Sequence, residues 1–427
     1  MLGSQQPIKA ATAQFTAILD TDEYFGQSVA AVGDIDGNGL NDIVTGFFDN
    51  YYEGDYDQYY VSVLFLDLVD NEVICVSFQK IYSPSSTAGN TRFGDSLTAL
   101  GDLNVDTVPD VAVGVPWDQD GGSSVGAVYI YFLAQDGTGH SYQKLSDSEG
   151  DFTYDLSSSE YFGCSVGALG DLNGDSVTEL AVGARNNDDG GSGTGAVYIL
   201  FLNTDGTCLS AQRISRSSGD FTYISSSPSS AGLGYAMSGL GDVNGDLIQD
   251  VLVGSYLDES VFVIFLAQTG VAVSFQKIGA DFGGLTATLG YYQNFGSACS
   301  SASDVNGDGL IDIMVGQRAI VDSVAVEQGD IFILFLDQNG RTISHQKISD
   351  NSGDFTAELW SGNDNYARFG LSCDLAGDMN GDGILDFLVG TRASYDSGAD
   401  HNDPGAIYIL FVSQSFGKQI IYIFMYI

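Results

Sequence analysis

Short apolar runs recur along the whole chain, and each group of runs contains four strand-like segments. The first segment begins at a Phe-Gly pair such as Phe25-Gly26, and the second is fully apolar, as in Val111-Ala112-Val113. The third is β-branched and aromatic, as in residues 195–202, and the fourth follows a short turn. Runs of this length without polar alternation are typical of strands buried on both faces. We therefore predict an all-β protein.

The turn before the fourth segment contains Asp-Gly or Asn-Gly, which favours a tight hairpin because that turn needs positive φ. The fourth segment repeats Gln-Lys/Arg-Ile/Leu. Its basic residue recurs as Lys80, Lys144, Arg213, Lys277 and Lys347. Because a charge on an outermost strand blocks edge-to-edge pairing, we interpret these residues as edge protection.

The four-segment group is repeated six times. The Asp-rich stretch between the first two segments begins at Asp34, Asp102, Asp171, Asp242, Asp304 and Asp378, so the steps are 68, 69, 71, 62 and 74 residues. Four antiparallel strands repeated at this spacing describe the blade of a β-propeller. We predict one propeller over residues 1–427, with approximate blades 15–80, 81–145, 146–215, 216–278, 279–348 and 349–427.

The end of the chain leaves two ways to close the last blade. Residues 420–427 are apolar and lack the Gln-Lys-Ile pattern, yet they are placed to form the last outer strand. Alternatively, residues 1–14 close the ring, since residues 6–9 loosely resemble the fourth segments. Both alternatives stay open at this point.

The composition changes the picture mainly through charge. The chain has 56 acidic and 14 basic residues and a net charge of −42, which argues against nucleic acid or an anionic membrane as a partner. No apolar run reaches the roughly 18 residues of a membrane-spanning helix, so no direct membrane insertion is expected. Residues 1–7 show no secretory signal. Six divalent cations would bring the net charge to about −30.

Catalytic chemistry finds little support in the sequence. The five cysteines form no Cys-x-x-Cys pair, and we expect them to be small core residues. Residues 163–167 match the Gly-x-Ser-x-Gly pattern of a nucleophile elbow. The equivalent stretches of sister repeats, such as residues 26–30, occupy the same strand, so we assign Ser165 to a structural role. We expect no enzyme activity.

Each Asp-rich stretch, which we call an Asp loop, places oxygen-bearing side chains at positions one, three, five and nine. The seventh residue can add its backbone carbonyl, as in the calcium loops of helical hands. The predicted ligands are Asp34, Asp36, Asn38, Leu40 and Asp42; Asp102, Asn104, Asp106, Val108 and Asp110; Asp171, Asn173, Asp175, Val177 and Glu179; Asp242, Asn244, Asp246, Ile248 and Asp250; Asp304, Asn306, Asp308, Leu310 and Asp312; and Asp378, Asn380, Asp382, Ile384 and Asp386.

All-oxygen ligation by a flexible loop with several carboxylates favours calcium, and we predict up to six ions. Position six is glycine in the first, fifth and sixth loops but Thr107, Ser176 and Leu247 in the others. Because non-glycine residues resist the left-handed conformation of a sharp loop, we expect firm binding in the first group and weaker binding in the second.

Phe-Gly, the Asp loop and an ending such as Val113-Gly114-Val115-Pro116 together resemble the FG-GAP repeats of the integrin alpha-chain propeller. The turn at residues 201–206 is similar to microbial integrin-like FG-GAP proteins. The resemblance covers essentially the whole chain. It implies calcium in the hairpin between a blade's first two strands, on the lower face, and partners on the opposite face. The family usually has seven blades, whereas this chain has six motifs.

These observations give two hypotheses about function. The first is a calcium-stabilised propeller, extracellular or at the cell surface, that binds a protein or glycan ligand on the face opposite the Asp loops. Loops between the second and third strands, such as residues 49–57 and 116–120, carry acids and aromatics suited to contacts. The alternative is the non-catalytic propeller of a larger secreted enzyme, phospholipase-like or glycosidase-like.

Overall fold

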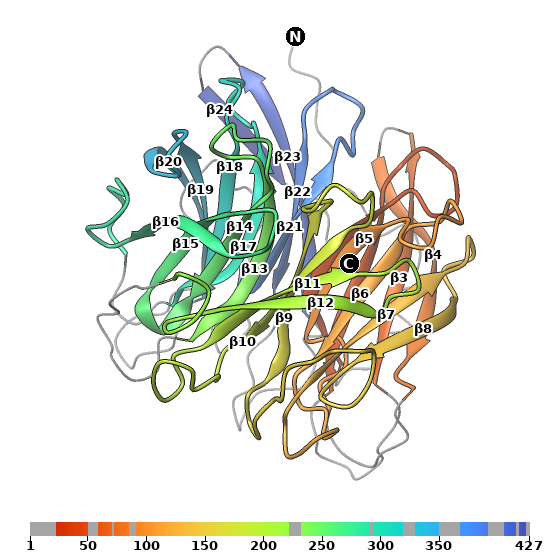
Figure 1. The fold of residues 1–427 in the computed structure, drawn as a ribbon. Coiled ribbons are helices and arrows are strands. Elements are labelled where there is room, and N and C mark those ends of the chain that lie inside the picture. The colour runs from red at the N-terminus through yellow and green to blue at the C-terminus, as the bar shows by residue number, and fades with distance from the viewer. Residues whose placement is uncertain are drawn as a thin grey trace, which may run out of the picture.

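The computed structural model describes residues 23–49, 59–70, 72–84, 91–221, 232–289, 294–318, 329–349, 368–391, 405–415 and 418–423. Six four-stranded antiparallel sheets surround a common centre, as Figure 1 shows. In every sheet the strands follow chain order from the centre outward. The protein is therefore an all-β propeller of six blades, as the repeats predict.

The first three blades comprise β1 (Glu23–Gly33), β2 (Asp42–Asp49), β3 (Tyr60–Val69) and β4 (Glu72–Tyr82); β5 (Ser96–Gly101), β6 (Asp110–Val115), β7 (Ala127–Leu133) and β8 (Gly139–Leu145); and β9 (Phe162–Gly170), β10 (Glu179–Ala184), β11 (Ala196–Leu202) and β12 (Cys208–Ser215). The last three comprise β13 (Leu233–Gly241), β14 (Asp250–Ser255), the short 3₁₀ helix η1 (Tyr256–Asp258), β15 (Ser260–Leu266) and β16 (Ala272–Gly279); β17 (Phe295–Ser303), β18 (Asp312–Gln317), β19 (Asp330–Leu336) and β20 (Thr342–Ile348); and β21 (Ser372–Gly377), β22 (Asp386–Thr391), β23 (Ala406–Ser415) and β24 (Lys418–Ile423).

The hydrophobic core lies between blades and not inside any one of them. Second strands such as β10 and third strands such as β11 are buried along their whole length, which explains their lack of polar alternation. Six clusters of buried apolar side chains each join two neighbouring blades, and one of them joins the first blade to the last. Every blade therefore depends on two neighbours for its burial.

The first and last blades contact each other directly, so the ring is closed by six blades. The backbone N–H of Ala31 donates to Asp374 Oδ2 at 2.9 Å, and Asn41 Nδ2 donates to the carbonyl of Ala376 at 2.9 Å. The outer strand of the last blade is β24, which pairs with β23. This is the first of the two closures that the sequence left open. The alternative strand at residues 6–9 lies outside the described residues.

Paired glycines set the distance between neighbouring blades. A glycine near the end of each second strand faces the carbonyl oxygen of the Phe-Gly glycine in the next blade, and a Cβ added there would lie 2.1–2.3 Å from that oxygen. The six pairs are Gly46 with Gly94, Gly114 with Gly163, Gly183 with Gly234, Gly254 with Gly296, Gly316 with Gly370 and Gly390 with Gly26. The two glycines of the repeat motif are thus the two sides of one contact.

A serine two residues after the Phe-Gly glycine supports this contact in four blades. Ser28, Ser96, Ser165 and Ser372 donate from Oγ to the same carbonyl oxygen of the next blade at 2.6, 3.0, 2.7 and 3.1 Å. Ser165, the serine of the Gly-x-Ser-x-Gly match, is therefore engaged in the interface with the fourth blade.

Asp374 lies where the last blade meets the first, and its buried carboxylate should make the stability of the protein depend on pH. Its carboxylate accepts hydrogen bonds from the Ala31 N–H and the Ser300 hydroxyl, and burial raises its pKa to about 6. Between about pH 4 and 6, Asp374 therefore binds more protons in the folded state than in the unfolded state. The contribution of Asp374 to the free energy of unfolding falls as the pH rises through that window. Asp374→Asn should be more stable than the parent by about 2 kcal/mol at pH 7.5. The difference should shrink at pH 4.5 in urea titrations, and a pH-independent difference would contradict the assignment.

Candidate metal centres

Each Asp loop connects the first strand of a blade to the second, so all six loops lie at the same end of the ring. The position-one aspartate organises the loop by accepting backbone N–H groups. In the third loop Asp171 Oδ1 accepts from Gly174 at 2.6 Å and from Asp175 at 3.0 Å, while Oδ2 accepts from Ser176 at 2.8 Å. The same contacts recur around Asp242, Asp304 and Asp378. The spacing of the sequence motif thus reflects a tightly curled turn.

In five loops the position-nine aspartate ties the loop to the third strand of its own blade, whereas Glu179 accepts from the Leu172 N–H and from Asn173 Nδ2 within its own loop. Asp42 is fully buried, and it accepts from the N–H of Ile35 at 2.9 Å and from that of Leu66 at 3.0 Å. Burial raises the pKa of Asp42 and Asp110 to about 6 and that of Glu179, Asp250, Asp312 and Asp386 to about 7. Desolvation is the largest cause, and neighbouring carboxylates of the same loop raise the pKa further. Each loop therefore concentrates negative charge that a cation would offset.

The first loop brings its carboxylates closest together. Ligand oxygens of Asp34, Asp36 and Asp42 all lie within 4.8 Å of one another, and over the described ranges no other group of three His, Cys, Asp or Glu side chains does so. This loop has aspartate at position three and asparagine at position five, the reverse of its sisters. Its Asn38 Nδ2 turns away to donate to the Leu66 carbonyl at 2.7 Å. The donor set and its convergence fit a hard cation.

In four other loops the asparagine at position three donates instead to the aspartate at position five. These contacts are Asn104 to Asp106, Asn173 to Asp175, Asn244 to Asp246 and Asn306 to Asp308, at 2.9–3.0 Å. The amide thereby occupies a carboxylate oxygen that a cation would need. The ligand assignments in these loops and in the sixth, and the position-seven carbonyls of all six, remain predictions.

Position six adopts left-handed backbone in all six loops, as the glycines there suggest. The φ angles are 94° at Gly39, 79° at Thr107, 71° at Ser176, 68° at Leu247 and 85° at both Gly309 and Gly383. The second loop carries a further strained residue, because Val105 at position four has φ of 64° where its sisters have glycine. β-branched residues are the least suited to this region. The second loop is thus the most strained of the six.

Relieving this strain gives a prediction. Val105 and Thr107 are exposed, Val105 at 76%, so replacing either side chain sacrifices no packing. Val105→Gly and Thr107→Gly should each stabilise the protein by about 1 kcal/mol in urea unfolding. Val105→Ala is the control, because alanine keeps a Cβ in the left-handed region and should give little of this gain. Equal stability of Val105→Gly and Val105→Ala would contradict the strain argument.

The basic residues of the fourth strands contact groups of their own blade, and their role in edge protection remains a prediction. Lys144 Nζ lies 3.2 Å from Asp118 and 3.4 Å from Asp120 in the loop between β6 and β7. Arg213 pairs with Asp189, Lys277 with Asp258 and Lys347 with Asp330, and Lys80 lies over the Tyr60 ring. Each cation tethers the outermost strand to its own blade. Asp118 and Asp120 therefore serve this contact, while residues 50–58 of the other suggested contact loop lie outside the described residues.

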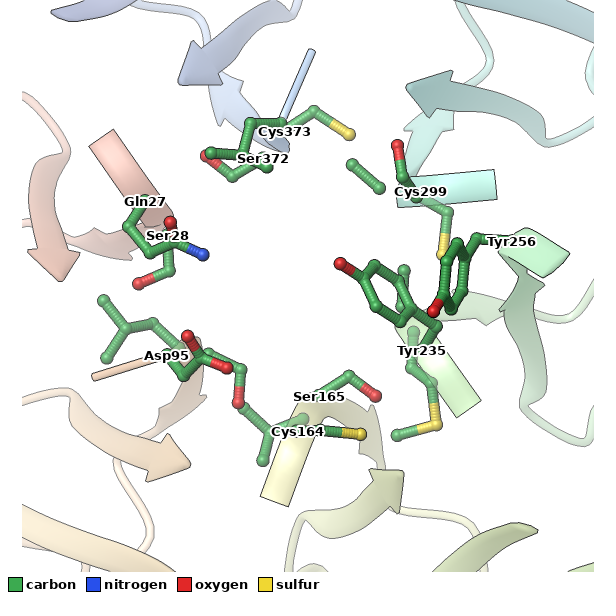
Figure 2. Close-up of a pocket in the computed structure, with 18 of the residues that line it drawn as sticks. Gln27, Ser28, Asp95, Cys164, Ser165, Tyr235, Tyr256, Cys299, Ser372 and Cys373 are labelled. Atoms are coloured by element: carbon green, nitrogen blue, oxygen red, sulfur yellow. The ribbon is translucent and has the colours of Figure 1, made fainter. Parts of the chain in front are cut away.

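A cavity of about 300 Å³ lies on the axis at the end away from the Asp loops. The first strands of all six blades contribute to its wall, and Figure 2 shows Ser28, Ser165 and, just before β5, Asp95 among the lining residues. Cys164, Cys299 and Cys373 also line it, and all five cysteines are free thiols. The wall also includes Arg92, Arg185, Arg318 and Arg368. We call this cavity and its arginines the channel mouth.

The sequence analysis did not predict the channel mouth, because it considered the repeated motifs and not the arginines next to them in the chain. Two of its arginines directly precede a Phe-Gly pair, and the other two directly follow a second strand. Those places lie next to the axis at one end of the propeller. With Arg392, which directly follows β22 in the sequence, five of the 14 basic residues fall in these places, and this enrichment was the available signal.

Comparison with known proteins agrees with this geometry. The model of the FG-GAP repeat family matches residues 164–200, which contain the third Asp loop. Mouse integrin alpha-2 is 42% identical over 107 residues, covering 25% of this chain and 8% of that protein. Human integrin alpha-11 is 32% identical over 164 residues, covering 38% and 13%. The matches thus span a small part of these relatives.

A solved structure of a protein from Lactobacillus plantarum aligns over 93% of this chain and 83% of its own, at 13% identity and a TM-score of 0.45. That likeness is too remote to support an argument. The fold defines the class: the chain is a six-bladed β-propeller, with an FG-GAP repeat matched at residues 164–200 and similarity over part of its length to integrin alpha chains. In the described part of the chain no helix is long and apolar enough to cross a membrane.

Proposed function

We propose that this propeller is a calcium-stabilised adhesion module, extracellular or at the cell surface, that binds a protein or glycan ligand on the face opposite the Asp loops. The convergence of Asp34, Asp36 and Asp42 in a repeated loop carries the calcium part of the proposal. The similarity to integrin alpha chains supports the adhesion part. Binding is proposed rather than catalysis, with no role for nucleic acid given the net charge of −42.

The metal's role in this proposal is structural. A bound calcium ion would supply positive charge where carboxylates are densest. Asp34 and Asp36 would hold it from the loop, and Asp42 would link it to the third strand through the Leu66 N–H. Asp110, Asp250, Asp312 and Asp386 make the same contact with their third strands and would link their loops to their blades in the same way. Glycine at position six gives the first, fifth and sixth loops the firmer sites.

The opposite face is proposed for the partner because its residues are carried on loops of a rigid ring. Trp117 follows β6 there and is partly buried, with the Arg92 guanidinium 4.2 Å from its ring centroid. An aromatic anchor positioned by an arginine is a common feature of binding hot spots. The Asp loops, by contrast, are committed to their own backbone.

A cell-adhesion assay tests the proposal. Protein immobilised in about 1 mM calcium, the range used by extracellular modules, should retain cells from a panel of types, and chelation should release them. Trp117→Ala should reduce adhesion, whereas Leu247→Ala on an Asp loop should not. If no cell type in the panel adheres, the proposed function is wrong. If only Leu247→Ala reduces adhesion, the partner binds on the face of the Asp loops and not on the opposite face.

A further inference from the structure

The channel mouth is a positively charged site in a strongly acidic protein. Its wall contains four arginines and, in the part of the chain described, a single carboxylate, that of Asp95. Among the described wall residues, cationic groups thus outnumber carboxylates, in a chain whose net charge is −42. Elsewhere the described fourth-strand cations pair with carboxylates or pack on rings of their own blade, so this imbalance is local to the axis.

Two of the guanidinium groups gather at one pair of aromatic rings. Arg318 Nη1 donates to the Tyr235 hydroxyl at 3.4 Å, and the Arg185 guanidinium lies 5.6 Å from the Tyr235 ring centroid. Tyr235 itself packs against Tyr256, with the two rings tilted by 42° and their centroids 4.1 Å apart. Within the described ranges, Arg185 and Arg318 reach no carboxylate at ion-pair distance. Aromatic faces orient these two cations without neutralising them.

The third arginine at the mouth is held differently. Arg92 Nη1 lies 3.6 Å from Asp95 Oδ2, and the Arg92 guanidinium also covers the Trp117 ring at 4.2 Å. Asp95 is thus occupied by Arg92, although it still acts on Arg185 from a longer distance. Because Asp95 is paired with Arg92, it does not neutralise Arg185 and Arg318 as well.

The channel below the mouth has different chemistry. A second cavity of about 270 Å³ continues along the axis, lined mainly by small residues such as Gly167 and Gly239, with Asp374 as its one charged group among the described residues. An anion at the mouth would meet this carboxylate if it moved deeper. The site is therefore placed at the entrance of the channel and not along it.

We propose that the channel mouth binds a small divalent oxyanion, a carboxylate or a tetrahedral oxyanion, between Arg185, Arg318 and the neighbouring arginines. Partly burying guanidinium groups without counter-charges is unfavourable, and an oxyanion restores that balance. The planar guanidinium fork matches two oxygens of such a group. A cationic ligand is disfavoured by the same charges. This inference is independent of the calcium loops and of the proposed adhesion function.

Isothermal titration and thermal melts with sulfate and malonate test the proposal. Both are compared with chloride at equal ionic strength and without added calcium. Saturable binding of at least one anion is expected, weakened at least tenfold, about the loss of one charged hydrogen bond, in Arg185→Gln/Arg318→Gln. The tighter anion identifies the class of oxyanion. Arg318→Gln alone, which loses one hydrogen bond to Tyr235, gives a second variant should the double variant fold poorly.

The control is Arg341→Gln, an exposed arginine on the β19–β20 hairpin that removes the same charge elsewhere. Sulfate also stabilises folded proteins without a site, so a melting-temperature rise alone is not sufficient. Binding kept in Arg341→Gln and lost in the mouth variants supports the site. An equal response in all variants, or no saturable binding of either anion to the parent, overturns it.

Discussion

Gly183→Ala is expected to destabilise the protein by about 3 kcal/mol or more, near the upper end of the cost of overpacking a core. The new methyl would lie 2.1 Å from the carbonyl oxygen of Gly234 and 2.3 Å from Ser165 Oγ. The first of these neighbours is backbone in the next blade, which is itself held by two interfaces. Relief therefore requires the blades to separate, and separation loosens the apolar cluster between them. Urea unfolding followed by circular dichroism measures the loss.

The matched control is Gly174→Ala in the third Asp loop. Gly174 has φ of 86° and nothing within 4 Å of an added Cβ, so alanine there meets backbone strain but no clash. It should cost about 1 kcal/mol. A loss at Gly183 no larger than that at Gly174 would show that the interface can give way, and the glycine pairs would then not set the blade spacing.

The same glycines explain why so much of the fold could be predicted from the sequence. Each repeat carries both sides of a contact with its neighbours, so a local motif reports a long-range arrangement. Phe162 and Gly163 begin a strand, and Gly183 ends the next strand against the following blade. Six copies then imply six equivalent interfaces. The ring closes with the six blades that the motifs predict, and not with the seven usual in the family, because the sixth blade packs directly on the first.

The candidate sites were less predictable, for physical reasons that differ between them. Loop spacing identified which side chains share an Asp loop, but only coordinates show that Asn38 turns to the Leu66 carbonyl while Asn104 donates to Asp106. The inward pairing of Lys144 depends on the path of the β6–β7 loop. The channel mouth joins residues as distant as Arg92 and Arg368, whose proximity follows from ring closure and from no local pattern.

Calcium should raise the melting temperature by more than any single substitution lowers it, apart from those at the glycine pairs. A ligand that binds only the folded state stabilises it by about 2.7 kcal/mol per site at a concentration one hundred times its dissociation constant. Several loops contribute together because they lie on one closed ring. Chelator-treated protein, titrated with calcium during thermal melts, should show a progressive rise. Magnesium should give a smaller one, because it retains its waters and needs octahedral geometry.

Variants of the first loop connect this rise to a defined site. Asp34→Asn/Asp36→Asn removes two of the three converging carboxylates and should lower the number of bound calcium ions by one, as measured by isothermal titration. Asp205→Asn, in the exposed β11–β12 turn, removes one acidic charge outside the Asp loops and should leave the stoichiometry unchanged. Asparagine at position 34 keeps one acceptor oxygen, so it can still accept the N–H of Gly37 although it loses the contact with Gly39. The contacts of the buried Asp42 are unchanged, so the loop variant should fold. Identical melting curves with calcium and with chelator would refute the calcium proposal, and the six Asp loops would then be turns that satisfy only their own backbone.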